Sequence, residues 1–343
     1  MLGAAPKPLK VSFRPSPETD QLAYFYAGLD GELAAMSSDR IHYVPRQHPL
    51  GDVDVVLLTA HGSDLAPYLT DLRGQLPAHA LIVLWFWDNH VAQVNNLRSA
   101  VAADLLIASH AYCAEALFNA VSVVGGACPL CCAQWGATEL NSFVRSIDAR
   151  PRADKLLVNY VDYGFSARTA VLQQLKQEMP EAEMLLMQPD DRSRYFSKPS
   201  AQRFEEWLGY KTTLILPVTQ DLSTRVFDAL AAGLIPIVPR SLRDFDHVIP
   251  PNVQSSLGIT RVDGLSTQVI RAAWAEATKR FDQMGLEGIL TRHRYVVDQH
   301  LLPHRVETLV RITTTVLDGL AAPEWSAEPY PMGLMLKQRT PAS

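Results

Sequence analysis

Long apolar runs are missing from this sequence. No stretch approaches the roughly 20 consecutive apolar residues that a helix needs to cross a bilayer, and residues 1–10 lack the apolar core of a signal peptide. A basic excess is missing too, because 31 lysines and arginines stand against 36 acidic residues and give a net charge of −5. These absences argue against a membrane-spanning protein and against a general nucleic-acid binder. We expect a cytoplasmic protein with, at most, peripheral membrane contact.

Cysteine is scarce and poorly spaced for disulfides. The four cysteines are Cys113, Cys128, Cys131 and the adjacent Cys132, which is a weak disulfide framework and agrees with a reducing compartment. The Cys-Pro-Leu-Cys-Cys run could supply half of a zinc site, with His110 and Cys113 as the other half. A structural zinc site needs two well-spaced pairs. We therefore expect free thiols and no metal, with zinc as the alternative.

A dinucleotide-binding glycine motif is also absent. No Gly-x-Gly-x-x-Gly follows a predicted strand, and Gly125-Gly126 is too little to replace it, which argues against a nicotinamide-dependent dehydrogenase. The chain has 343 residues, of which 48% are hydrophobic and 20% charged. That length and composition are typical of a globular protein with about two domains and an ample core.

The most informative stretch is residues 212–239. It contains an apolar, β-branched run at 214–218, a polar turn, a helical pattern that Ser223 can cap, and a second apolar run at 234–238. Gly233 stands where the helix ends, as a residue that tolerates positive φ should. The short loops predict a β-α-β unit with parallel strands.

Polar residues gather at the start of this predicted helix. Asp221 precedes Arg225 by four positions and Thr224 precedes Asp228 by four, so each pair is predicted to share a helix face. Ligands of parallel sheets bind at the carboxyl ends of the strands, beside helix N-termini. An arginine and a carboxylate at that place suit an anionic ligand that carries hydroxyl groups, such as a nucleotide.

The segment 225–238, Arg-Val-Phe-Asp-Ala-Leu-Ala-Ala-Gly-Leu-Ile-Pro-Ile-Val, resembles the C-terminal-domain signature of GT-B glycosyltransferases. It is similar to the Glu-Ala-x-Ala-x-Gly-x-Pro-Val core of the family-4-like enzymes and to the Arg-x-Phe-Glu-Ala-Leu-x-Ala-Gly-x-Ile-Pro form of the exostosin-like ones. The resemblance implies that Asp228 holds the ribose hydroxyls of a donor nucleotide. The chain departs from the pattern in having Asp rather than Glu there, and Gln220, beside Asp221, where an earlier acidic residue is expected.

Two predicted strands of the amino-terminal half end in polar clusters. The strand at 52–60 ends in His61, followed by Gly-Ser-Asp64, and the aromatic strand after it ends in Asp88-Asn-His90. A histidine or aspartate at a strand's carboxyl end is well placed to accept a proton from a bound acceptor. The alternative is that His61 and Asp88 only cap the helices that follow them.

The carboxyl-terminal half restarts with an apolar strand at 155–161. A turn containing Gly164 follows, and Arg168 lies in the first turn of the next helix, where the helix dipole does not favour a cation. Such a cation suits a site beside a bound phosphate, although a solvated arginine is an equal alternative. The basic run at 292–295 is predicted to lie on the surface of a helix.

The predicted fold class is α/β, with two Rossmann-like domains as in GT-B enzymes and parallel sheets that face each other across a cleft. We assign residues 1–125 to an acceptor-binding domain, 126–152 to a linker, and 153–322 to a nucleotide-sugar-binding domain. The tail, 323–343, is a candidate to cross back to the first domain, as the last helix of GT-B proteins commonly does.

The resemblance implies a glycosyltransferase that moves a sugar from a nucleotide-sugar to an acceptor hydroxyl of a glycan, protein or small molecule. We expect neither a metal nor another cofactor. The expected donor-binding residues are Asp221, Ser223, Thr224, Arg225, Asp228, Arg168 and Gly164. The candidate bases for an inverting reaction are His61, Asp64, Asp88 and His90, whereas in a retaining reaction the leaving phosphate can take the proton. A sugar-nucleotide epimerase of the same fold and a non-catalytic nucleotide-sugar-binding protein remain alternatives.

Overall fold

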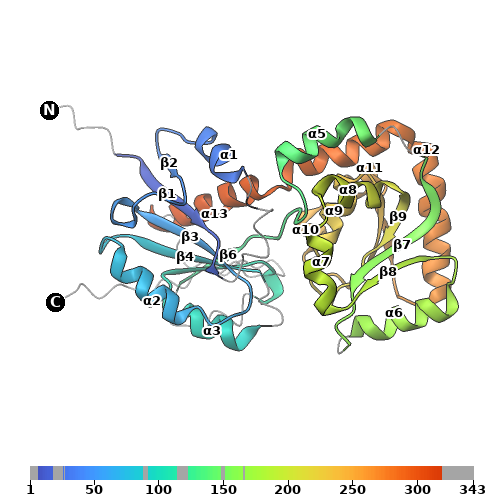
Figure 1. Ribbon diagram of the computed structural model, residues 1–343, viewed down its shortest axis with the longest axis horizontal. Coiled ribbons are helices and arrows are strands. Elements are labelled where there is room, and N and C mark those ends of the chain that lie inside the picture. Colours follow the sequence, from blue (N-terminus) through green and yellow to red (C-terminus); the bar gives the residue numbers. More distant parts are fainter. Residues whose placement is uncertain are drawn as a thin grey trace. The chain divides into compact units, whose positions relative to one another are not determined.

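The computed structural model describes residues 7–17, 26, 28–87, 92–113, 123–147, 151–164 and 167–318. Contacts within the chain divide it into two units (Figure 1). Unit 1 combines Met1–Pro129 with Leu302–Ser343, and unit 2 is Leu130–Leu301. Each unit contains a parallel β-sheet with helices packed against it, so the predicted α/β class is confirmed.

Unit 1 has a sheet in the order β2-β1-β3-β4-β5-β6, with every described pair parallel. Its strands are β1 (Leu9–Arg14), β2 (Ile41–Val44), β3 (Val55–Ala60), β4 (Leu81–Phe86), β5 (Leu105–Ala108) and β6 (Val123–Ala127). Its helices are α1 (Leu29–Ala35), α2 (Ala66–Gln75), α3 (Gln93–Ala100) and α13 (Leu302–Leu317). All residues of β3 are buried, as expected of a central strand covered on both faces.

Unit 2 has a sheet in the order β11-β10-β9-β7-β8, again parallel throughout. Its strands are β7 (Ala153–Val161), β8 (Glu183–Met187), β9 (Tyr210–Leu214), β10 (Ile235–Pro239) and β11 (Thr260–Val262). Its longer helices are α5 (Ala137–Ile147), α6 (Ala167–Glu178), α8 (Ser200–Leu208) and α12 (Thr267–Gln299). The shorter ones are α7 (Arg192–Phe196), α9 (Arg225–Ala231), α10 (Phe245–Val248) and α11 (Pro251–Leu257).

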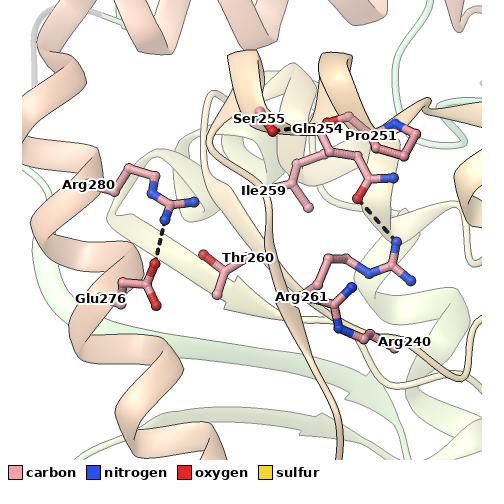
Figure 2. A pocket seen from close by; sticks show the side chains of 9 residues that line it. All are labelled: Arg240, Pro251, Gln254, Ser255, Ile259, Thr260, Arg261, Glu276 and Arg280. Atoms are coloured by element: carbon pink, nitrogen blue, oxygen red, sulfur yellow. Dashed lines mark hydrogen bonds and ion pairs between the residues drawn. The ribbon is translucent and has the colours of Figure 1, made fainter.

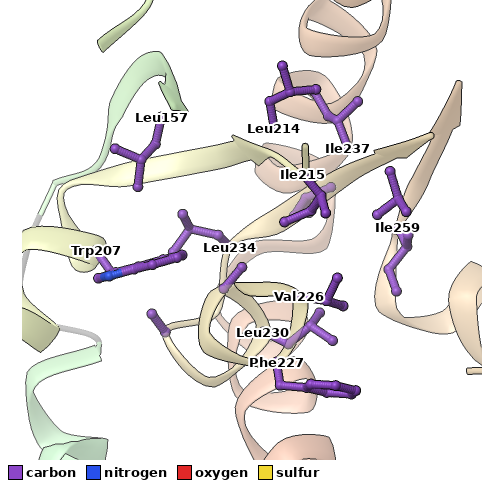
Figure 3. Close-up of a cluster of buried hydrophobic side chains, with 14 of the residues drawn as sticks. Leu157, Trp207, Leu214, Ile215, Val226, Phe227, Leu230, Leu234, Ile237 and Ile259 are labelled. Atoms are coloured by element: carbon purple, nitrogen blue, oxygen red, sulfur yellow. The ribbon is translucent and has the colours of Figure 1, made fainter. Parts of the chain in front are cut away.

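The predicted β-α-β unit lies at the centre of unit 2 as β9-α9-β10. Figure 3 shows its core, in which side chains of α9, among them Val226, Phe227 and Leu230, pack with the strand residues Leu214 and Ile237. The prediction of a strand at 214–218 was wrong by four residues at its start, since β9 is Tyr210–Leu214. Only Ile215 extends the ladder, through its N–H to the Ile237 carbonyl at 2.9 Å.

The ladder stops there for a chemical reason. Pro217 has no N–H to donate to a neighbouring strand, and the Leu216 N–H donates to the Tyr160 hydroxyl at 2.7 Å rather than to the sheet. Helix α9 begins at Arg225 with Thr224 at its N-cap, one residue later than the predicted cap at Ser223. Ends of helices commonly differ by one residue between expectation and structure.

Gly233 ends this helix as predicted. Its φ is 77°, in the left-handed region, and its N–H donates to the Leu230 carbonyl at 2.9 Å. A Cβ at this position would lie 2.5 Å from Cγ2 of Ile289 in α12. Both the backbone conformation and the close approach of α12 therefore require glycine.

The domain limits differ from those predicted. Helix α13, assigned above to the second domain, packs in unit 1 against α1 and β6, and its Arg305 carbonyl accepts from the Cys128 thiol at 3.8 Å. The predicted linker contains the end of β6 and the whole of α5. The tail beyond residue 318 lies outside the described residues.

Within the described ranges, no helix has the length and apolarity needed to cross a membrane.

Candidate functional site

The strand order of unit 2 creates a switch point between β7 and β9. The chain runs outward from β7 to β8 on one side, and from β9 to β10 and β11 on the other. At such a point the loops leaving two adjacent parallel strands turn in opposite directions, and they open a crevice at the carboxyl ends of the strands. The side chains near this switch point come from the end of β7, the start of α6 and the start of α9.

Two arginines flank one tyrosine at this switch point. The guanidinium carbon of Arg168 lies 4.9 Å from the ring centre of Tyr160, and that of Arg225 lies 5.4 Å from the same ring. The Tyr160 hydroxyl accepts from Leu216 N–H and donates to the Leu214 carbonyl at 3.0 Å. Because the tyrosine on β7 is tied in this way to the chain leaving β9, both arginines have a fixed support.

Each guanidinium has a carboxylate within reach of its charge, Asp221 for Arg168 and Asp228 for Arg225, but among the described residues neither arginine forms an ion pair. Arg168 is buried and donates to the Val161 carbonyl at 2.9 Å. Burial lowers its pKa most, and the charge of Arg225 lowers the pKa further, whereas Tyr160, Tyr163 and the charge of Asp221 raise it. In the described part of the chain, the buried Nη1 of Arg225 has no hydrogen-bond partner. An anion placed between them would supply the missing acceptor and relieve the repulsion.

The polar residues of the β9-α9 turn shape its backbone. One carboxylate oxygen of Asp221 accepts from the N–H groups of Val218 and Thr219 at 2.9 and 3.0 Å, so Asp221 lies in the turn and does not share a helix face with Arg225 as predicted. The Ser223 hydroxyl accepts from the Arg225 N–H at 3.3 Å, and Thr224 caps α9 without a hydrogen bond from its side chain. The turn therefore presents Arg225 in a fixed position.

Gly164 belongs to the turn after β7. Its φ is 74°, and no heavy atom lies within 4 Å of the place where a Cβ would be. Its N–H donates to the Asp162 carboxylate at 3.0 Å, and the same oxygen accepts from the Thr169 hydroxyl at 2.9 Å. The open space beside this glycine is compatible with close approach of a ligand.

Asp228 lies in a buried network, within reach of the Arg225 charge. Its side chain is 2% exposed. One oxygen accepts from the Cys132 thiol at 3.2 Å and from the Ala133 N–H at 3.0 Å, and the other accepts from the Gln134 amide at 3.3 Å. The Gln134 carbonyl in turn accepts from the Tyr195 hydroxyl at 3.2 Å. In this conformation Asp228 holds the segment 132–134, and a ribose could reach the carboxylate only if that segment moved.

Burial is the largest influence on the pKa of Asp228. Burial raises its pKa above the ordinary 3.8, although the charge of Arg225 and the hydrogen bonds from residues 132–134 act in the opposite direction. Burial also raises the pKa of the Cys132 thiol, and the Asp228 charge adds to that rise. The thiol is therefore a neutral hydrogen-bond donor to the carboxylate.

The amino-terminal candidates lie in unit 1. The His61 ring follows β3 and packs against Trp87, with ring centres 4.4 Å apart. Asp64 accepts from the Ala66 N–H at 3.0 Å, and the N-cap of α2 is Leu65, so His61 does not cap the next helix. Asp88 and His90 lie outside the described residues. The assignment of a catalytic base among these four remains a prediction.

The cysteines are buried where the structure describes them. These are Cys128, Cys131 and Cys132, and His110 is buried with its ring stacked near Tyr112. Across the described ranges, no group of three or more His, Cys, Asp and Glu side chains is placed to hold a metal ion.

Tyr160 is the residue of this site that the sequence did not single out. After Lys155, the predicted strand at 155–161 is apolar except for Asn159 and Tyr160 near its carboxyl end. A tyrosine at that end of a buried parallel strand, just before a glycine turn, is the signal that could have identified it.

No family model matches the chain, and no curated protein matches it significantly. Similar solved structures exist at low identity. A sucrose-phosphate synthase from Thermosynechococcus elongatus is 12% identical and has a TM-score of 0.55, with 91% of this chain and 100% of that chain covered. The catalytic domain of starch synthase IV from Arabidopsis thaliana, bound to ADP and acarbose, is 11% identical with a TM-score of 0.46, over 76% and 73% of the two chains.

An α,α-trehalose 6-phosphate synthase from Burkholderia multivorans is 13% identical with a TM-score of 0.43, over 89% and 77% of the two chains. These neighbours are glycosyltransferases of the GT-B type. The likeness to the sucrose-phosphate synthase establishes a shared fold. The chain has the α/β fold with two parallel sheets that is found in GT-B glycosyltransferases.

Proposed function

We propose that this protein is a glycosyltransferase that uses a nucleotide-sugar donor, with the diphosphate bound between Arg168 and Arg225. The observation that carries the proposal is the pair of guanidiniums within 5.4 Å of the Tyr160 ring centre, at the switch point of the unit 2 sheet. Structural neighbours of the same fold that transfer sugars support it.

The chemistry of the pair suits a diphosphate leaving group. When the bond between the sugar and the nucleotide breaks, negative charge develops on the diphosphate, and fixed cations beside it lower the barrier. Arg168 and Arg225 are held by Tyr160 before any ligand arrives, so little reorganisation is needed. Two guanidiniums can take the role that a divalent cation takes elsewhere, and we propose a reaction that does not depend on a metal.

Asp228 is proposed to contact the ribose, as the resemblance implies. The buried network sets a condition on this role, because the segment 132–134 must release one carboxylate oxygen. The acceptor and its catalytic base are proposed to lie with the residues of unit 1, His61 and Asp64 among them. A glycan, a protein or a small molecule can serve as acceptor in this proposal.

Calorimetric titration with UDP, GDP, dTDP and CMP tests the donor site. One nucleotide should bind to the wild type, and Arg225→Gln should weaken it by about 10- to 100-fold, the loss expected for one charge-assisted hydrogen bond to phosphate. Arg294→Gln, at an exposed arginine paired with Glu287, is the matched control for loss of charge. Equal affinities for the wild type and Arg225→Gln, or no binding of any nucleotide, would refute the assignment.

A further inference from the structure

A cavity lies at the outer edge of the unit 2 sheet. It has a volume of about 550 Å³ and is bounded by the edge strand β11 and the helices α11 and α12, as Figure 2 shows. Strands β10 and β9 separate β11 from β7. The cavity is therefore separate from the switch point beside Tyr160.

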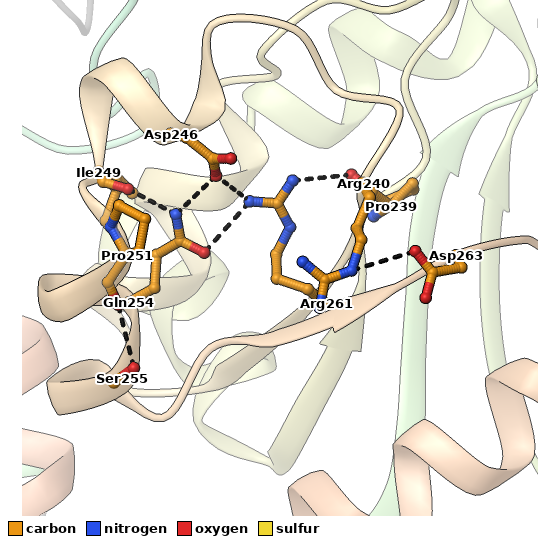
Figure 4. A network of polar contacts seen from close by, with 9 residues as sticks. All are labelled: Pro239, Arg240, Asp246, Ile249, Pro251, Gln254, Ser255, Arg261 and Asp263. Carbon is orange, nitrogen blue, oxygen red and sulfur yellow. Dashed lines mark hydrogen bonds and ion pairs between the residues drawn. The ribbon is translucent and has the colours of Figure 1, made fainter.

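Three arginines from different elements line this cavity. Arg240 follows β10, Arg261 belongs to β11 and Arg280 belongs to α12, and Glu276 is the one acidic residue among the lining side chains. Figures 2 and 4 both show Arg240 and Arg261 next to each other, and the charges of both reach the Asp246 carboxylate. The lining therefore carries an excess of positive charge that is concentrated at the Arg240–Arg261 pair.

Acidic residues hold these guanidiniums in place but use only part of their donors. Arg240 Nε pairs with Asp263 at 3.1 Å. Arg261 donates through Nη1 to Asp246 and, at 3.1 Å, to the Gln254 side chain, and through Nη2 to the Pro239 carbonyl at 3.5 Å (Figure 4). Neither Asp246 nor Asp263 lines the cavity. An arginine has five N–H donors, so fixed and unused donors remain on the Arg240–Arg261 pair.

Two buried polar atoms beside the cavity have no hydrogen-bond partner among the described residues. One is the Nε of Arg261, whose guanidinium lies 4.4 Å from the Phe245 ring centre. The other is the Thr260 hydroxyl, on a residue that is 5% exposed. In Figure 2 this hydroxyl lies on the side of Arg280 and Glu276. Buried polar atoms are nearly always paired, so each unpaired one indicates a missing partner.

We propose that this cavity binds a small phosphorylated polyol, such as a sugar phosphate. The phosphate contacts the guanidiniums of Arg240 and Arg261, which match a dianion with several acceptor oxygens. Hydroxyl groups of the polyol reach the Thr260 hydroxyl and the Glu276 carboxylate. The volume is sufficient for such a ligand. None of the nine lining residues is aromatic, so a nucleobase would have no ring to stack on.

Titration calorimetry with glucose 6-phosphate, inorganic phosphate and glucose tests this site. Glucose 6-phosphate should bind more tightly than inorganic phosphate, and glucose should not bind measurably. Arg240→Gln should weaken glucose 6-phosphate binding by about tenfold or more. Its side chain is 59% exposed, so the replacement leaves the core intact. Thr260→Val should weaken binding of glucose 6-phosphate and leave that of inorganic phosphate unchanged.

Controls separate this site from the one beside Tyr160. Arg225→Gln should leave glucose 6-phosphate binding unchanged, and Arg240→Gln should leave nucleotide binding unchanged, so either site can fail without the other. The proposal is overturned if Arg240→Gln binds glucose 6-phosphate as the wild type does, if Arg225→Gln abolishes that binding, or if neither phosphate compound binds at millimolar concentration.

Discussion

Truncation of Asp228 is expected to destabilise unit 2 by about 2–4 kcal/mol. In Asp228→Ala the Ala133 N–H and the Gln134 amide lose their acceptor, and each orphaned buried N–H costs about 1–3 kcal/mol. The Cys132 thiol is a weak donor and adds little. The loss is partly offset because removing a buried acid also removes the cost of its desolvation.

Asp228→Asn is the matched control, because it keeps the shape of the side chain. Its carbonyl can still accept from Cys132 and Ala133, but its amide then faces the Gln134 amide, donor against donor. Gln134 can rotate its amide, and the Tyr195 hydroxyl can become the acceptor. The cost should therefore be about 1 kcal/mol. Urea unfolding followed by tryptophan fluorescence measures both variants, and Trp135, buried beside the segment, is a local probe.

The stability difference between the wild type and Asp228→Asn should change with pH in one direction. The pKa of Asp228 is higher in the folded protein than its ordinary 3.8, so the folded state retains the proton longer than the unfolded state. The stability that this acid contributes is fully present below pH 3.8 and is lost as the pH rises through the folded pKa. The stability of the wild type relative to Asp228→Asn should fall across that range. This account of the network is refuted if the stability difference between the wild type and Asp228→Asn rises with pH. It is also refuted if the stability of Asp228→Ala lies within 0.5 kcal/mol of the wild type, which is about the effect of an ordinary surface substitution.

Two further predictions concern the frame of unit 2. Gly233→Ala should cost about 2–5 kcal/mol in thermal unfolding, because left-handed backbone strain of about 1–2 kcal/mol adds to overpacking against Ile289 of about 1–3 kcal/mol. Gly28→Ala, with φ of 79° and open space at its Cβ position, should show the strain alone, and equal losses would contradict the predicted clash. Tyr160→Phe should cost about 1–3 kcal/mol in urea unfolding, since the Leu216 N–H loses its acceptor; unchanged stability would show that the hydroxyl does not support the crevice.

Local patterns predicted the elements of unit 2 better than the surroundings of its charged residues. The β-α-β unit and the glycine that ends its helix follow from periodicity and backbone chemistry, and both are confirmed. The prediction that residues 292–295 form a surface patch was wrong for Arg292 and His293, which are 0% and 2% exposed. Helix α12 passes the end of α9, where the Ala231 and Gly233 carbonyls have no partner within the helix.

Arg292 Nε donates to the Gly233 carbonyl at 2.9 Å, and His293 Nδ1 donates to the Ala231 carbonyl at 2.6 Å. These two side chains of α12 therefore supply the hydrogen-bond donors that the carbonyl groups at the end of α9 lack. A pattern of charges along one segment cannot reveal this role, because the acceptors belong to a helix far away in the sequence.

The candidate site could not be predicted from local sequence patterns either, because it depends on the order of the strands in the sheet. Arg168 and Arg225 were each selected from local features, one as a cation in the first turn of a helix and the other within a motif. Their convergence on Tyr160 depends on β9 pairing with β7, with β8 on the far side of β7. A parallel sheet with β9 beyond β8 would use the same segments and separate the two guanidiniums. Strand order depends on how all the helices cover the sheet, and so the site became visible only with the fold.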